Sequence, residues 1–150
     1  MQWLDRDQPQ NQKCMMFEIL KGHTMKKIIE TKNAPAPVGP YSQAVEIDGT
    51  IFCSGQVPII PESGEVFTGD ISEQTRIVME NVKAVLTASD LHFKNIVKTT
   101  IFLTDMSDFA KVNEVYAKYF DEEPPARSCV AVKELPKGVN VEVEVLCRRF

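Results

Sequence analysis

Near the C-terminus, an arginine, a cysteine and two glutamates stand at spacings that could bind a small anion and supply a base. Arg127 and Cys129 lie two residues apart, and Glu142 and Glu144 alternate with valines beyond a Pro-Lys-Gly turn at 136–138. Because side chains along a strand alternate between its two faces, each pair shares one face of its own strand. A guanidinium pairs bidentately with a planar carboxylate, so these consecutive strands predict an anion site with a base beside it.

The same spacings also fit purely structural roles. Arg127 could form an ion pair with Glu142 or Glu144, and either glutamate could be an ordinary solvated strand residue. The nearby guanidinium would favour the thiolate form of Cys129. A Cys/His catalytic pair is poorly supported, because no histidine lies near Cys129 in the sequence and His92 follows the end of a predicted helix.

The composition is that of a globular protein with one domain. The chain has 150 residues, of which 43% are hydrophobic and 25% charged, and it is long enough to bury a substantial core. The net charge is −4 and no Lys/Arg-rich run is present, which argues against nucleic-acid binding through phosphates. No apolar stretch approaches the ~20 residues of a membrane-spanning helix, so we expect no membrane partner.

The cysteines do not have the spacing of a metal site. The chain has four cysteines and two histidines without a CxxC pair, so we predict no metal ion. Cys53 and Cys147 are interpreted as small apolar strand residues. The first residues carry Asp5, Asp7 and several glutamines where a signal peptide would need an apolar segment. Without an export signal, reduced thiols and a cytoplasmic location are expected.

Residues 1–24 differ from the rest of the chain. They are polar and lack clear periodicity, and an orderly strand pattern begins only after Met25. Lys21-Gly22 would be encoded by a purine-rich stretch shortly before that methionine, which is how a ribosome-binding site would read if it were translated. We hypothesise that the native start is Met25 and that 1–24 is an extension or a mis-assigned start. An ordinary N-terminal helix or arm is the alternative, and 25–150 is expected to be a single domain.

Local signals predict elements in the order β-β-β-α-β-α-β-β. Asp48-Gly49 marks a hairpin, and Asp70 with Glu73 forms a capping box before a helix whose valines recur at helical spacing. Asp105 or Ser107 is expected to cap the second helix. The predicted strands span 26–30, 44–48, 50–54, 95–104, 127–134 and 140–149, and the predicted helices run from 70 to about 88 and from 105–107 to about 120.

Two amphipathic helices can cover one face of a mixed sheet, which makes the expected fold class α+β. On the fourth strand, Val97 and Ile101 are predicted to share one face. Nothing in the remaining chain can cover the opposite sheet face, which should include Ile96, Phe102 and Cys129. A half-apolar open sheet face predicts burial against another subunit.

Specific motifs spread over most of the chain belong together in one protein family. They are GPYSQA at 39–44, FCSGQVP at 52–58, NVKAVL at 81–86, KTTIFL at 98–103 and the segment 125–145. On these motifs the chain resembles the YjgF/RidA family of reactive intermediate deaminases. The likeness covers Met25 to Arg149 almost without interruption, and 1–24 has no counterpart.

The resemblance implies both an assembly and an activity. The fold would be chorismate-mutase-like, and three sheets would form a central β-barrel in a homotrimer, with the helices outside and a cleft between neighbouring subunits. The activity would be hydrolysis of 2-iminobutanoate and 2-iminopropanoate to 2-oxo acids and ammonia, without a cofactor. Such imines leak from pyridoxal-phosphate dehydratases acting on threonine and serine and damage other pyridoxal-phosphate enzymes, so the reaction would be protective.

The resemblance also implies roles for individual residues. Arg127 would bind the substrate carboxylate, and Glu142 would hold and activate water. Asn113 could equally satisfy a buried backbone group, and Tyr41 could simply pack under a loop. The substrate-binding set implied by the family is Tyr41, Ser54, Gly55, Asn113, Arg127 and Cys129.

Two other functions stay open from the sequence. The same pocket could bind 2-oxobutanoate or a similar acid and report it to a partner without doing chemistry. Ribonuclease or translation-inhibitor activity also attaches to the family, but the net charge of −4 counts against it. The presence of both Arg127 and Glu142 favours the deaminase.

Overall fold

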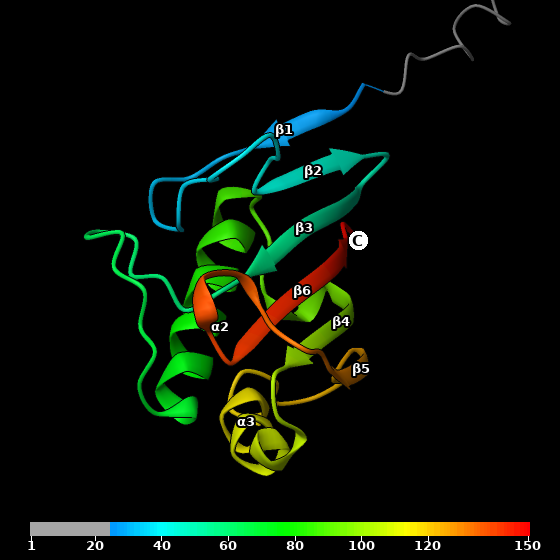
Figure 1. Ribbon diagram of the computed structural model, residues 1–150. Coiled ribbons are helices and arrows are strands. Elements are labelled where there is room, and N and C mark those ends of the chain that lie inside the picture. The colour runs from blue at the N-terminus through cyan, green and yellow to red at the C-terminus, as the bar shows by residue number, and fades with distance from the viewer. Residues whose placement is uncertain (1–24) are drawn as a thin grey trace, which may run out of the picture.

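The computed structural model describes residues 25–150 as one mixed β-sheet backed by two α-helices (Figure 1). The hypotheses on residues 1–24 lie outside the described residues. The strands lie side by side in the order β1-β2-β3-β6-β4-β5, and all neighbours are antiparallel except β4 and β5. Their bounds are β1 Lys27–Ile29, β2 Ala44–Ile47, β3 Thr50–Gln56, β4 Ile96–Leu103, β5 Ala126–Ala131 and β6 Val141–Arg148.

The predicted strands and their order along the chain are confirmed. β2 and β3 form a hairpin through Asp48 and Gly49, whose φ angles of 50° and 72° are those that an Asp-Gly turn requires. β3 runs two residues beyond its predicted end at 54, because Gln56 resumes pairing with Val143 of β6 after an irregular stretch. β5 ends at 131 rather than 134.

The first helix, α2 (Ile71–Ala88), begins at its predicted cap Asp70, but the Glu73 side chain accepts from Arg76 instead of completing the predicted capping box. Asp70 Oδ2 accepts hydrogen bonds from the backbone N–H of Ser72 at 2.9 Å and of Glu73 at 3.3 Å. These bonds satisfy backbone donors that the first turn of a helix leaves free. The apolar side of α2 then packs against β3 and β6, behind the sheet in the view of Figure 1.

The second helix, α3 (Phe109–Ala117), is shorter than predicted. Asp105 caps a separate 3₁₀ turn, Met106–Asp108, by accepting a hydrogen bond from Ser107 N at 2.8 Å. The residues after Ala117 continue as hydrogen-bonded turns rather than as helix. α3 lies on the same side of the sheet as α2 and contacts it, so the α+β arrangement with both helices on one face is confirmed.

The core lies between the helices and the sheet. Val141, Val143 and Val145 of β6 are buried there, as their alternation predicted. Cys53 and Cys147 are buried in the same core, on neighbouring strands. The contact with Cys147 and burial together raise the pKa of the Cys53 thiol, so it stays protonated and packs as a small apolar group.

The prediction for the start of β4 was wrong. A bulge between Ile96 and Lys98 shifts the register against β6 and turns the two first side chains over. Val97, expected with Ile101 on the covered face, is 39% exposed, and Ile96, expected on the open face, is buried in the core. Thr99 and Ile101, beyond the bulge, are buried as the alternation predicts.

The opposite face of the sheet carries apolar side chains that no helix between 25 and 150 covers. Phe52 of β3 is 46% exposed and faces Leu146 of β6 across the pair, and Val130 of β5 is 42% exposed beside Phe102. Such a surface favours contact with another copy of the chain. Within the described residues, no helix is long and apolar enough to cross a bilayer.

Candidate active site

Arg127 lies at the edge of the sheet, against one side of α3. Its Nη1 donates a hydrogen bond to Asn113 Oδ1 at 2.8 Å. The guanidinium carbon lies 5.0 Å from the centre of the Tyr116 ring and 5.5 Å from that of Phe109, within the range of cation–π attraction. Arg127 and Asn113, both predicted as site residues, are therefore in direct contact.

The guanidinium of Arg127 has no carboxylate partner among residues 25–150. The alternative of an ion pair with Glu142 or Glu144 within the chain is thus wrong. Arg127 instead opens onto a cavity of about 450 Å³. The cavity is lined by Asn113, Tyr116, Ala117, Phe120, Pro124, Pro125 and Arg127.

Cys129 follows Arg127 on the same face of β5, but not on the face that was expected. It lies beside buried Ile101 of β4 and packs against the core, so it belongs to the helix-covered side. Burial raises the pKa of its thiol, and the smaller opposing effect of Arg127 does not reverse this. The predicted effect of the guanidinium, which favours the thiolate, is therefore outweighed by burial, and the thiol of Cys129 stays protonated.

Glu142 lies in a different cavity, of about 460 Å³. Burial raises the pKa of its carboxyl group, and the charge of Glu144 raises it further. Three of the predicted substrate-binding residues, Tyr41, Ser54 and Gly55, line the same cavity. A half-buried carboxylate with a raised pKa is suited to accept a proton from water.

The carboxylate of Glu142 lies directly against Gly55, where there is no room for a side chain unless the carboxylate moves. A Cβ built on Gly55 would lie 2.7 Å from Cδ of Glu142 and 3.0 Å from its Cγ. The glycine was expected to allow close approach of a ligand, and in the chain it allows close approach of the candidate base. It falls in the irregular stretch of β3 between Cys53 and Gln56.

The hydroxyl groups of this cavity are partly committed to the loop before β2. Ser54 Oγ donates to the backbone oxygen of Ser42 at 2.7 Å and keeps its lone pairs as acceptors. The hydroxyl of Tyr41 accepts a long bond of 3.4 Å from Val38 N, and its side chain is 52% exposed at the rim. Tyr41 is therefore free to contact a ligand, rather than packed under the loop.

Sequence reasoning missed Lys137, which lines the Glu142 cavity. Its φ of 60° is a left-handed conformation that is uncommon outside glycine. The Pro-Lys-Gly sequence predicted only a turn, and nothing local indicated that Pro136 and Lys137 would line the same cavity as Glu142.

The chain divides the predicted site residues into two groups. Arg127, Asn113 and Cys129 lie on the helix-covered face, whereas Glu142 alternates with buried valines and lies toward the opposite face. The strands β5 and β6, consecutive in sequence, are not neighbours, because β4 lies between them. The expected direct cluster of Arg127 with Glu142 is therefore absent within one chain.

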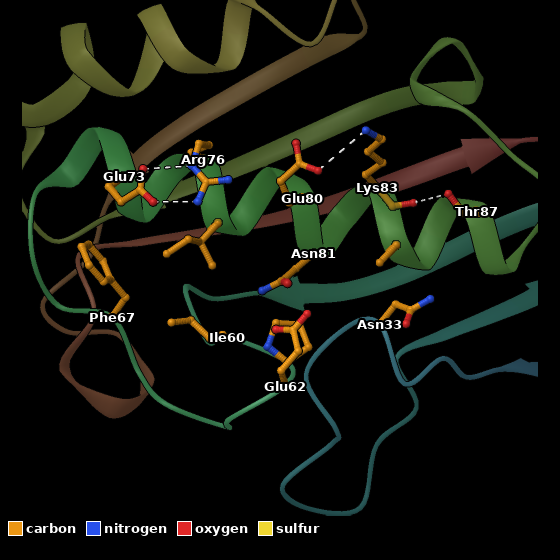
Figure 2. A pocket seen from close by; sticks show the side chains of 13 residues that line it. Asn33, Ile60, Glu62, Phe67, Glu73, Arg76, Glu80, Asn81, Lys83 and Thr87 are labelled. Carbon is orange, nitrogen blue, oxygen red and sulfur yellow. Dashed lines mark hydrogen bonds and ion pairs between the residues drawn. The ribbon is translucent and has the colours of Figure 1, made fainter.

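A further cavity of about 600 Å³ lies between α2 and the loop 57–69 (Figure 2). Ion pairs join Glu73 to Arg76 and Glu80 to Lys83 along its helical wall. No predicted site residue lines it. In the part of the chain that the structure describes, no three His, Cys, Asp or Glu side chains gather as metal ligands would.

Comparison with known proteins places these features in a family. Residues 31–148 match the family described as Endoribonuclease L-PSP. TdcF of Escherichia coli, named as a reactive intermediate deaminase, is 48% identical over 128 residues, covering 83% of this chain and 98% of TdcF. The 2-iminobutanoate/2-iminopropanoate deaminase of Mus musculus is 45% identical over 122 residues, covering 81% of this chain and 90% of the mouse protein.

Solved structures agree with the fold. The crystal structure of E. coli TdcF with bound serine superposes with a TM-score of 0.79 at 46% identity, covering 83% of this chain and 99% of that one.

Proposed function

The chain belongs to the YjgF/RidA family, and from this premise we propose that it is a hydrolytic deaminase of short 2-imino acids. The observation that carries the proposal is the guanidinium of Arg127, which is held in place on α3 and has no carboxylate partner among the described residues. A half-buried guanidinium without a counterion is a site for an anion of planar shape. A 2-imino acid supplies such a carboxylate next to its reactive carbon.

The two groups of site residues meet between subunits. The chain forms a homotrimer with a central β-barrel, in which the open sheet faces are buried and each cleft joins Arg127 of one copy to Glu142 of another. The exposed apolar side chains Phe52 and Val130 support this assembly. The separation of Arg127 and Glu142 within one chain supports it as well, since within residues 25–150 the Arg127 cavity lacks a base and the Glu142 cavity lacks the arginine that would bind a carboxylate.

The mechanism requires only a carboxylate anchor and a base. Arg127 binds the substrate carboxylate, and the carboxylate of Glu142 removes a proton from water as its oxygen bonds to the imine carbon. That proton passes from Glu142 to the imine nitrogen, which gives a neutral carbinolamine. The carboxylate of Glu142 then takes the proton of the new hydroxyl group and passes it to the amino nitrogen. Cleavage of the C–N bond releases ammonia and leaves the 2-oxo acid. Tyr41 and Ser54 hold the substrate or the water.

The substrates are 2-iminobutanoate and 2-iminopropanoate, the compounds in the name of the mouse relative. The serine bound to TdcF is an amino acid of matching size, which supports a pocket for small carboxylates. These imines are released in the cytoplasm by pyridoxal-phosphate dehydratases, so their removal protects enzymes that carry the same cofactor.

The test is ammonia release from 2-iminobutanoate, generated in place by a threonine dehydratase. Protein at substoichiometric concentration accelerates the release, and Arg127→Ala lowers kcat/KM about 100-fold or more, because the anchor of the substrate carboxylate is lost. Arg76→Ala, which removes an exposed arginine paired with Glu73, is the matched control and keeps full activity. Size-exclusion chromatography confirms that each variant assembles.

Two results would separate the alternatives. Binding of 2-oxobutanoate without catalytic turnover would replace the deaminase with a sensing module. Cleavage of RNA that survives in Arg127→Ala, with no effect on imines, would point to the ribonuclease in the family description.

A further inference from the structure

Arg127 is supported by a single stripe of α3. Phe109, Asn113 and Tyr116 recur at i, i+4 and i+7, which places them on one side of the helix. All three touch the guanidinium, two with their rings and one with its amide oxygen. We name these three residues the arginine cradle.

The cradle leaves one particular edge of the guanidinium free. Among the described residues, the hydrogen bond recorded for the Arg127 side chain is from Nη1 to Asn113. The Nε and Nη2 groups, which form the side-on fork, donate to no described residue. In the same chain, Arg76 and Arg149 use Nε and Nη2 to bind Glu73 and Glu46, with distances of 2.7–3.2 Å.

We infer that the arginine cradle fixes the plane of Arg127 so that its Nε/Nη2 edge faces the ligand, which makes Phe109 and Tyr116 positioning residues for carboxylate recognition. The inference rests on the proposed function for the identity of the ligand. An aromatic face holds a guanidinium by cation–π attraction and shields that face from water. The Asn113 amide blocks rotation by occupying Nη1.

The ring of Tyr116 is itself held from the strand beside Arg127. Its hydroxyl donates to Thr99 Oγ1 at 3.1 Å, and Thr99 is fully buried on β4 opposite Arg127 in the β4–β5 pair. Burial raises the pKa of the Tyr116 hydroxyl, which keeps the ring neutral. The pair of strands β4 and β5 therefore positions both the backbone of Arg127 and the Tyr116 ring that packs against its guanidinium.

The variants distinguish the contribution of the Tyr116 ring from that of its hydroxyl group. Phe109→Leu is the primary variant, because Phe109 is 37% exposed and its truncation leaves the core intact. Tyr116→Leu removes the second ring, and Tyr116→Phe keeps the ring while losing the bond to Thr99. Tyr119→Leu is the matched control, since Tyr119 contacts Phe93 and Glu80 rather than Arg127.

Arg127, held by the cradle, binds the carboxylate in the ground state and in the transition state alike, so loss of a cradle ring raises KM more than it lowers kcat. Phe109→Leu and Tyr116→Leu each raise KM for the imino acid about 5-fold to 10-fold, with kcat within about 3-fold of wild type. The Kd of 2-oxobutanoate, measured by calorimetry, rises in parallel. Tyr116→Phe stays within about 3-fold of wild type in both measurements.

Asn113 gives a further test, in which two variants have a predicted order of effect on carboxylate binding. Asn113→Ala frees Nη1 and weakens carboxylate binding modestly, whereas Asn113→Asp supplies a competing carboxylate and weakens it further. A merely structural asparagine would lose stability in both variants without this order in Kd.

The outcomes distinguish the inference from the proposed function. If wild type releases ammonia and the leucine variants keep wild-type KM and Kd, the cradle is overturned and the deaminase stands. If wild type does not hydrolyse imines but binds 2-oxobutanoate, and the leucine variants weaken that binding, the deaminase falls and the cradle stands. If wild type binds no 2-oxobutanoate, the cradle is overturned.

Discussion

The two charged side chains of the candidate site owe their chemistry to opposite surroundings. Arg127 is surrounded by aromatic faces and one neutral amide, so its positive charge is available to bind an anion. Glu142 is half-buried next to Glu144, so its carboxyl group gives up its proton reluctantly. We propose that Arg127 binds the substrate carboxylate and that Glu142, with its raised pKa, accepts and returns a proton, the two roles that imine hydrolysis needs.

The raised pKa of Glu142 predicts a pH dependence. A base must be deprotonated to act, so the rate falls as the pH drops through the pKa of Glu142, and this fall begins at higher pH than for an ordinary carboxyl group. Glu144→Gln removes the repulsion that helps raise this pKa. We expect the acidic limb of kcat/KM to move to lower pH in this variant.

The control is Glu65→Gln, which removes an exposed loop carboxylate with no part in the site. Its pH profile should match that of wild type. An acidic limb that stays in place in Glu144→Gln would contradict the prediction that the charge of Glu144 helps set the pKa of the base.

At the scale of elements, local signals were sufficient for the strands and helices but not for their arrangement. The Asp48-Gly49 hairpin and the Asp70 cap depend on neighbouring residues, and both were predicted. The insertion of β6 between β3 and β4 depends on pairing between distant segments, which a local pattern does not contain. The bulge at Val97 interrupts a regular alternation and shows no glycine or proline that would signal it.

The irregular stretch of β3 predicts the effect of a single methyl group. Gly55→Ala would place a side-chain carbon into the carboxylate of Glu142, which must then move. We expect kcat to fall about 100-fold, because a displaced base no longer aims the water, while KM stays near wild type. Steady-state ammonia release measures both constants.

Gly64→Ala is the matched control for this variant. Gly64 has a φ of 70° and open space around its Cα, so alanine adds backbone strain without touching the site. Its unfolding free energy should fall by about 1 kcal/mol with kcat unchanged. A Gly55→Ala enzyme with wild-type kcat would show that the position of Glu142 does not matter for turnover.

At the scale of the whole molecule, the site is predicted to exist only in the assembly. The sequence allowed the site residues to be named, through the resemblance, but not to be divided between faces of the sheet. Arg127 and Glu142 read as neighbours because their strands are consecutive, and the fold separates them by a strand and by a face. Contacts between chains would decide which sheet faces meet, and the local sequence of a single segment does not predict such contacts.

A mixing experiment tests whether two copies share each site. We expect Arg127→Ala and Glu142→Gln each to be inactive alone. If Arg127 and Glu142 of one site come from different subunits, refolding the two variants together restores about one quarter of wild-type activity, as random cyclic assembly predicts. Activity that stays at the level of the separate variants would show that each chain holds a complete site.

The contact between Gly55 and Glu142 also limits which substitutions evolution can accept at the two positions. A side chain at position 55 and the carboxylate of Glu142 would compete for the same space, so a larger residue at 55 displaces the acid. A descendant that gains bulk at 55 must move, shorten or lose the acid at 142, and a lineage that no longer carries out the chemistry is free to make such a change. The pair thus serves as a marker, readable from sequence, of which descendants of this fold still carry the base.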